Sequence, residues 1–130
     1  MTAVVVDTSI FVAVEEGREV EPFDGLCRVS VATITELELG VFLARDPANR
    51  RRRTVTLARA RTHVPIAYDE RVSTELARLL TELRHADRKV GVFDCIIAAT
   101  AIAAGLSVYT QDRDFELLRD HAGGPNVVLG

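Results

Sequence analysis

Four acidic residues that lie far apart in the sequence are the strongest candidates for chemistry in this chain of 130 residues. We call them the four acids, and they are Asp7, Glu36, Asp94 and Asp112. Carboxylate oxygens without histidine or cysteine are the donors that hard cations such as Mg²⁺ and Mn²⁺ prefer. An acid cage around such a cation supports the attack of water on a phosphodiester.

Asp94 occupies an unusual place, because the stretch 92–105 is apolar on nearly every side and predicts a buried helix. Burying a lone charge costs many kcal/mol unless the charge is paired or binds a cation. The local alternative is that Asp94 caps the helix, since aspartate is a favoured cap residue.

The other acids have local explanations as well. Thr33 to Glu36 has the form of a capping box, and Asp7 could end a strand in a turn. Asp112 or Asp114 could cap a helix that begins near Phe115. Capping gives no reason, however, for all these acids to share one edge of the fold. Several unpaired carboxylates in one cleft repel one another, so such a cluster is hard to keep without a cation.

The alternation of strand-like and helix-like stretches predicts an α/β fold. We expect strands at 3–6, 27–31, 63–67, 106–109 and 126–129, and helices at 10–15, 33–44, 47–61, 69–87, 92–105 and 115–121. This order favours a central parallel sheet of four to five strands with helices on both faces, in a single three-layer α/β/α domain over residues 1–130. Pro65 argues for an edge position of the third strand.

The topology also predicts where the acids meet. Ligands of parallel sheets bind where the strands end. Asp7 follows the first strand, Asp112 follows the fourth, and Glu36 and Asp94 lie in the first turns of helices that begin at the same edge. Asp114 is close enough to be a fifth acid at this edge.

Composition limits the class of protein. With 48% hydrophobic and 27% charged residues, the chain is expected to be globular. The longest apolar runs fall far short of the ~20 residues that span a bilayer, so we expect no membrane segment. No basic stretch precedes the first apolar residues, which indicates a cytoplasmic protein. Cys27 and Cys95 lack metal-ligand spacing and are expected to be free thiols.

The arginines are unevenly distributed, although the net charge of −3 does not itself indicate nucleic-acid binding. They crowd the segment 45–61, where Asp46 is the one acid. Arginine matches phosphate oxygens two at a time, so the run Arg50, Arg51, Arg52 and Arg53 is a candidate for RNA contacts. The alternative is a solvated helix face.

Three hydroxyls lie beside the acids in the sequence, those of Thr8, Ser9 and Thr110. They could orient a metal-bound water, with capping as the alternative for at least one of them.

Four stretches together resemble the PIN domain and, within it, the VapC-type toxins of bacterial toxin–antitoxin pairs. In the order of the family, they are Val5–Ser9, Ile34–Gly40, Asp94–Ala101 and Thr110–Phe115. The resemblance implies a metal-dependent endoribonuclease that cuts structured RNA, such as tRNA or rRNA, and inhibits translation.

The resemblance also implies roles for single residues and for partners. It implies that the four acids hold Mg²⁺, with Mn²⁺ as the alternative, and that Asp114 is secondary. Glu36 rather than Glu38 matches the position directly after the threonine of the second stretch. The further implications are a homodimer and a cognate antitoxin that inserts a segment into the acidic groove.

Two other classes of function compete with this interpretation. One is a degenerate PIN-like module that binds RNA or protein without catalysis. The other is a different metal-dependent phosphoryl hydrolase, such as a phosphatase with Asp7 as nucleophile. That chemistry usually needs a second acid two residues on, where this chain has Ser9. The glycine-rich fingerprints of nucleotide-binding folds are absent from the sequence.

Overall fold

The computed structural model describes residues 2–130, in which five strands alternate with six helices. The strands are β1 (Ala3–Val6), β2 (Leu26–Ser30), β3 (Pro65–Ile66), β4 (Ser107–Thr110) and β5 (Val127–Leu129). The helices are α1 (Thr8–Glu15), α2 (Val31–Leu43), α3 (Pro47–Ala60), α4 (Glu70–His85), α5 (Val92–Ala104) and α6 (Asp114–Ala122). The predicted α/β fold is confirmed.

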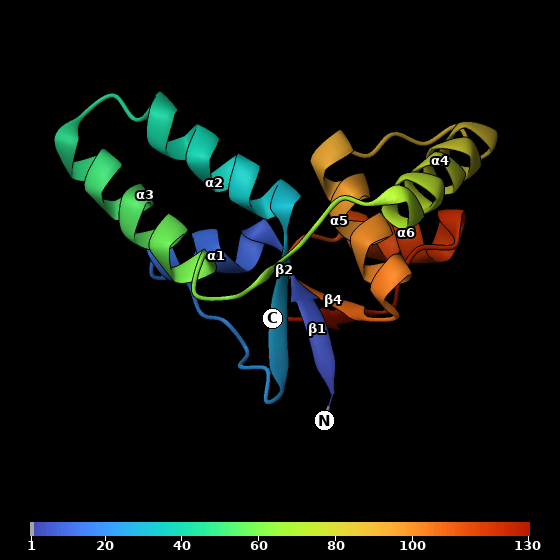
Figure 1. Ribbon diagram of the computed structural model, residues 1–130, viewed down its shortest axis with the longest axis horizontal. Helices are drawn as coiled ribbons and strands as arrows, with labels where there is room; N and C mark the ends of the chain where they lie inside the picture. Colours follow the sequence, from blue (N-terminus) through green and yellow to red (C-terminus); the bar gives the residue numbers. More distant parts are fainter. Residues whose placement is uncertain (1) are drawn as a thin grey trace.

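The sheet is parallel throughout, in the order β3-β2-β1-β4-β5. The short β3 lies at an edge, as Pro65 predicts, because proline lacks the N–H that a central strand would use. All strands point the same way, so their carboxyl ends share one edge of the sheet. Figure 1 shows α2 and α5 beginning beyond that edge, with the α2–α3 hairpin on one side and α4, α5 and α6 on the other.

Both faces of the sheet are covered by helices. Neighbouring residues of a strand point to opposite faces, and β1 uses both. Val5 packs in a core cluster with side chains of α4, α5 and α6. Val4 and Val6 pack on the other side with Ile10 of α1 and with Tyr109. This arrangement gives the three layers that the sequence predicts.

Helix α5 is buried on nearly every side, as its apolar sequence predicts. Its fully buried side chains include Cys95 and Ile97, and it ends at Gly105, whose φ of 69° favours glycine. Helix α4 covers it with the buried Leu79 and Leu83. Such a core holds the first turn of α5 in a fixed place at the carboxyl edge.

The start of α2 differs from the expectation of residue 33. The helix begins at Val31, because the Ser30 side chain accepts a hydrogen bond from the Ala32 N–H at 3.0 Å and caps it. Thr33 is fully buried inside the helix. The capping-box interpretation of Thr33 to Glu36 is therefore wrong, and Glu36 is left without that local role.

Two further expectations concern the chain as a whole. Cys27 and Cys95 are free cysteines, as predicted from their spacing. Within residues 2–130, the helices all lack the length and apolar character needed to cross a bilayer.

The packing of α4 yields a stability prediction. Leu79 is 2% exposed, so Leu79→Ala leaves a cavity, and we expect a loss of about 3 kcal/mol in the free energy of unfolding. Leu39→Ala is the matched control, because Leu39 is 45% exposed, and it should change stability by less than about 0.5 kcal/mol. Urea denaturation of the two variants checks this, and equal losses would contradict the described core.

Candidate active site

Asp7 lies directly after β1 and caps α1. The residue is 2% exposed, and its carboxylate accepts hydrogen bonds from the Ser9 N–H at 3.3 Å and from the Thr110 hydroxyl at 2.8 Å. Burial raises the pKa of Asp7, these hydrogen bonds oppose the rise, and the charge of Asp112 adds to it. The strand end and the cap together hold this carboxylate at the carboxyl edge of the sheet.

Glu36 lies in α2, where its Oε1 accepts a hydrogen bond from the Thr8 hydroxyl at 2.7 Å. Burial raises the pKa of Glu36, and the charges of Asp7 and Asp112 raise it further. Glu38 instead forms an ion pair with Arg61 at 3.0 Å. Of the two glutamates, Glu36 is therefore the one that faces the other acids.

Asp94 lies in the first turn of α5 but does not cap the helix. The cap residue is Gly91, and no side chain caps this end. Burial, together with nearby carboxylates, raises the pKa of Asp94 to about 8. The contributing carboxylates, in decreasing order, belong to Asp7, Asp112, Glu36 and Asp114. The capping alternative does not explain this residue.

Asp112 and Asp114 complete the group from the loop after β4 and the start of α6. One oxygen from each of Asp94, Asp112 and Asp114 lies within 4.8 Å of the other two. Asp112 also accepts a hydrogen bond from the Asp114 N–H at 2.9 Å, so it helps to begin α6 as well. Burial raises the pKa of Asp114, and the charge of Asp112 adds to the rise.

These five residues form what we call the carboxylate cluster, and its charges are not neutralised by basic side chains. The acids that form ion pairs within residues 2–130 are all others: Glu16, Glu38, Glu75, Glu116 and Asp120. Carboxylates brought together in this way disfavour one another's ionised forms. The electrostatics of the cluster therefore favour either bound protons or a bound cation.

The neighbouring hydroxyls hold the cluster in place. The buried Thr110 hydroxyl donates to Asp7 and accepts from the Asp112 N–H at 2.8 Å, so one side chain links two of the acids. Ser9 accepts from the Gln111 N–H at 2.9 Å. Thr8 lies within hydrogen-bonding distance of both Glu36 and Thr33. All three hydroxyls are thus engaged with protein groups.

The donor set fits a hard divalent cation. The acids Asp94, Asp112 and Asp114 alone could bind a metal ion, since their oxygens approach within 4.8 Å of one another. The hydrogen bonds of Asp7 both use Oδ2, and that of Glu36 uses Oε1. Each of these two carboxylates keeps another oxygen that could serve as a ligand. An all-oxygen set of this kind is the one that Mg²⁺ and Mn²⁺ prefer.

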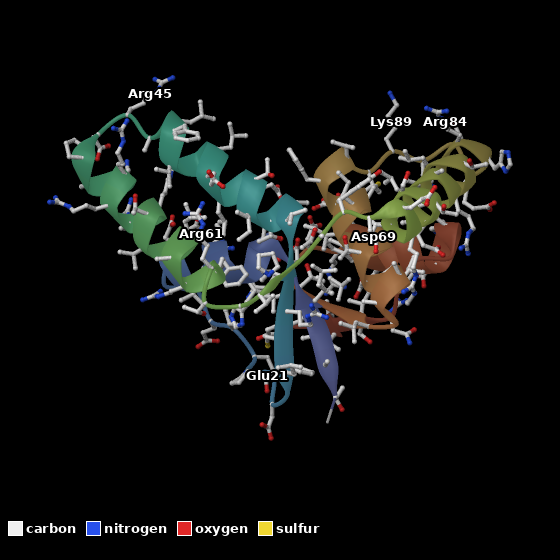
Figure 2. All side chains as sticks on the ribbon, viewed as in Figure 1. Glu21, Arg45, Arg61, Asp69, Arg84 and Lys89 are labelled. Carbon is white, nitrogen blue, oxygen red and sulfur yellow. The ribbon has the colours of Figure 1, made fainter. Side chains whose placement is uncertain are left out.

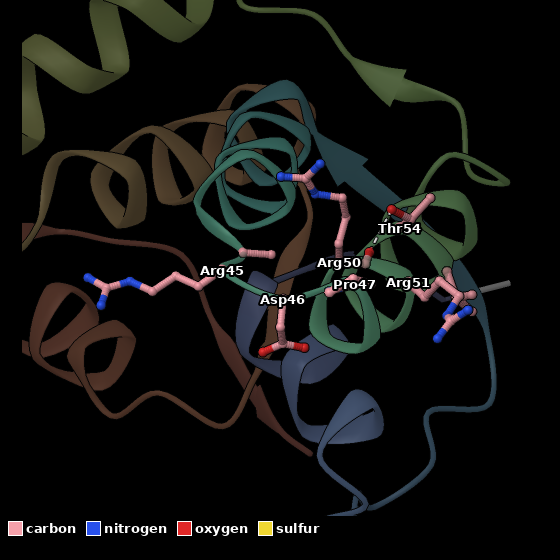
Figure 3. A pocket seen from close by; sticks show the side chains of 8 residues that line it. Arg45, Asp46, Pro47, Arg50, Arg51 and Thr54 are labelled. Atoms are coloured by element: carbon pink, nitrogen blue, oxygen red, sulfur yellow. Dashed lines mark hydrogen bonds between the residues drawn. The ribbon is translucent and has the colours of Figure 1, made fainter.

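The arginine run lies on α3, away from the first turns of α2 and α5. Arg53 donates to the Gly40 carbonyl at 2.7 Å and Arg52 to Asn49, so both make contacts within the α2–α3 hairpin. Arg50 and Arg51 are exposed beside a hollow of about 600 Å³ at the turn between the helices. Figure 3 shows Arg45, Arg50 and Arg51 extending in different directions around it.

Comparison with known proteins agrees with this architecture. The PIN domain family model matches residues 4–120. Ribonuclease VapC4 of Mycobacterium tuberculosis is 40% identical over 116 residues, which cover 88% of this chain and 89% of that protein. Ribonuclease VapC8 of the same species is 45% identical over 97 residues, which cover 73% of this chain and 87% of that protein.

Solved structures show the same fold. The crystal structure of VapBC-5, a member of the VapBC family of toxin–antitoxin systems from Mycobacterium tuberculosis, matches with a TM-score of 0.81 at 30% identity. That match covers 99% of this chain and 98% of the other. The DNA-bound VapBC of Salmonella typhimurium matches with a TM-score of 0.79 at 20% identity, which shows a shared fold. This chain belongs to the PIN domain family, within which it is related to the VapC ribonucleases of VapBC toxin–antitoxin systems.

Proposed function

We propose that this protein is a Mg²⁺-dependent endoribonuclease, with Mn²⁺ as the alternative cation, that hydrolyses phosphodiester bonds of tRNA or rRNA. The observation that carries the proposal is the convergence of five carboxylates, with no basic partner in residues 2–130, at one edge of the sheet. Relatives that are ribonucleases, at 40% and 45% identity, support RNA as the substrate class.

The proposed catalytic and metal-binding residues are the four acids, Asp7, Glu36, Asp94 and Asp112, with Asp114 added by its distance to Asp94 and Asp112. A divalent cation held there would lower the pKa of a bound water and offset charge on the phosphodiester. The Thr110 hydroxyl positions Asp7 relative to the Asp112 backbone, and Thr8 orients Glu36. Helix α5 holds Asp94 in a partly buried place that excludes part of the solvent.

We also propose the biological setting. The structural relatives include a member of the VapBC family of toxin–antitoxin systems and a toxin–antitoxin complex from Klebsiella pneumoniae. By analogy, this chain is the toxin of a type II pair, acts in the cytoplasm as a homodimer and inhibits translation until a cognate antitoxin inserts a segment into the acidic groove. Of the arginine run, Arg50, Arg51 and Arg52 are exposed for RNA contacts, whereas Arg53 is half-buried and donates to the Gly40 carbonyl.

One prediction of the proposed function concerns the four acids. Asp7→Asn, Asp94→Asn and Glu36→Gln should each reduce Mg²⁺-dependent RNA cleavage by at least about a hundredfold, because each removes a charge that holds the cation. Glu38→Gln is the matched control, since Glu38 pairs with Arg61, and its activity should stay within about twofold of the unchanged chain. Cleavage of a labelled tRNA by each variant and by the control, with and without chelator, measures these activities.

Two results would contradict the proposal in different ways. Cleavage that survives chelation and both aspartate substitutions would remove the carboxylate cluster from the chemistry. RNA binding without any cleavage or response to metal would favour the degenerate binding module.

Another prediction concerns the protons released when the cation binds. At pH 7 the carboxyl of Asp94 is mostly protonated, because its pKa of about 8 lies above that pH. A cation favours the ionised form, so binding of Mg²⁺ at pH 7 should release about one proton and should tighten as the pH rises towards 8. Titration calorimetry in two buffers of different ionisation enthalpy measures the released protons. If Asp94→Asn released the same number of protons, the released proton would not come from Asp94.

The raised pKa of Asp94 also predicts how the stability of the folded protein changes with pH. Between pH 4 and 8 the folded protein binds more protons at Asp94 than the unfolded chain does, so stability without metal should fall as the pH rises. Asp94→Asn removes this contribution, and its melting temperature in chelator should depend less on pH. A melting temperature that rises over this window in the unchanged chain and not in the variant would reverse the predicted sign.

A further inference from the structure

The turn between α4 and α5 carries a second concentration of charge, opposite in sign to the carboxylate cluster. A hollow of about 320 Å³ is lined there by Leu80, Leu83, Arg84, Asp87, Arg88, Lys89 and Val90. We call it the basic notch. Its volume lies at the small end of ligand sites, which span about 300 to 1,000 Å³. Lys89 is the one lysine of the whole sequence.

The cations of the basic notch are exposed and unpaired. Arg84, Arg88 and Lys89 are all exposed, and the ion pairs formed between residues 2–130 involve other arginines. Arg84 lies in the last turn of α4, where a cation also stabilises the helix end. Arg88 and Lys89 lie beyond the helix, so that explanation does not extend to them.

The backbone of the turn presents these side chains at the surface. Asp87 has a φ of 53°, a left-handed conformation in which glycine is usual, and the Arg88 N–H closes the turn on the Leu83 carbonyl at 2.9 Å. The chain thus ends α4 sharply and projects Arg88 and Lys89. Figure 2 shows Arg84 and Lys89 pointing outward together above the α4–α5 turn.

The notch lies at the same edge of the fold as the carboxylate cluster. Helices α4 and α5 pack side by side, and the turn that joins them leads into α5, whose third residue is Asp94. An RNA strand laid over the cluster meets repulsion from its carboxylates. Fixed positive charge beside the cluster would offset that repulsion and hold the strand, because phosphate contacts provide most of the affinity for nucleic acids.

We propose that the basic notch binds the backbone of the RNA strand beside the bond that is cut, with phosphates on Arg84, Arg88 and Lys89 and a sugar or base over Leu80 and Val90. The inference rests on the proposed function and adds to it a substrate-binding surface outside the carboxylate cluster. Because the floor is aliphatic and the cations contact phosphates, the notch positions RNA without selecting its sequence.

The test measures RNA binding apart from cleavage. A fluorescein-labelled single-stranded RNA of 16 nucleotides is titrated in Mg²⁺ against chains that carry Asp94→Asn, which should slow cutting enough for binding to be measured. Adding Arg88→Gln and Lys89→Gln should weaken binding about tenfold and should reduce the slope of log affinity against log salt by about 1.4, since each phosphate contact on a single strand contributes about 0.7.

The matched control removes two other exposed arginines, by Arg71→Gln and Arg119→Gln. Arg71 lies at the opposite end of α4, and Arg119 lies in the last turn of α6. The change in net charge is the same, so an effect of overall charge alone would weaken binding equally. We expect a change of less than twofold, and melting temperatures confirm that both double variants fold.

Asp87 provides a test in which RNA binding should become tighter rather than weaker, because it is the acid among the residues that line the notch. Asp87→Asn keeps a residue that tolerates the left-handed conformation and removes the negative charge. It should tighten RNA binding roughly threefold, the effect of one exposed charge near a phosphate in water. Lys89 also allows direct detection, since saturating RNA should slow acylation of its amine by an N-hydroxysuccinimide ester at least threefold, as measured by mass spectrometry of the peptide.

The outcomes separate the two proposals. A chain that cuts RNA in Mg²⁺ but keeps its affinity, its salt dependence and its KM after Arg88→Gln and Lys89→Gln would overturn the basic notch alone. Acylation of Lys89 that RNA does not slow would also overturn it. RNA left uncut by the unchanged chain would instead contradict the proposed function.

Discussion

Repulsion among like charges is the constraint on which the rest of this structure depends. Five carboxylates from four separate parts of the chain share one edge of a parallel sheet, and burial adds to the free-energy cost of their repulsion. Folding must hold them together against that repulsion. The core provides the opposing free energy, because its buried side chains fix α4, α5 and α6 on the sheet. They include Ile97 and Phe115, which are fully buried, and Leu79. The core of this protein thus maintains a charge arrangement that is unfavourable without protons or a cation.

Most of the fold could be predicted from the sequence, because its hydrophobic pattern is local and strong. Three stretches each indicate one element: the run Val4–Val6, the apolar stretch of α5 and the amphipathic stretch of α4. The alternation of strands and helices then favours a parallel sheet. The start of α2 was predicted wrongly, since Ser30, Thr33 and Thr35 are all acceptable cap residues in sequence. Only the backbone geometry shows that Ser30 is the cap.

The site could be predicted in outline, and its details depend on directions that a sequence does not contain. Topology indicates which residues reach the carboxyl edge, and the structure does bring the four acids there. Topology does not indicate that Glu38 forms an ion pair with Arg61, or that Thr110 links two acids. Nor does it indicate that an oxygen of Asp114 lies within 4.8 Å of oxygens of both Asp94 and Asp112. The basic notch escaped sequence analysis because a cation in the last turn of a helix and two more in the polar turn that follows are common, and their exposure without acidic partners is a property of the fold.

The most direct test of the central claim, that the carboxylate cluster holds a divalent cation, is anomalous diffraction from crystals of the protein grown with Mn²⁺. We expect one or two anomalous peaks about 2.0 to 2.3 Å from carboxylate oxygens of Asp94 and Asp112, with Asp114, Asp7 or Glu36 completing the shell directly or through water. The same crystals of Asp94→Asn should show weaker peaks. A map without a peak among these oxygens, or with Mn²⁺ only at other surface acids, would contradict the account.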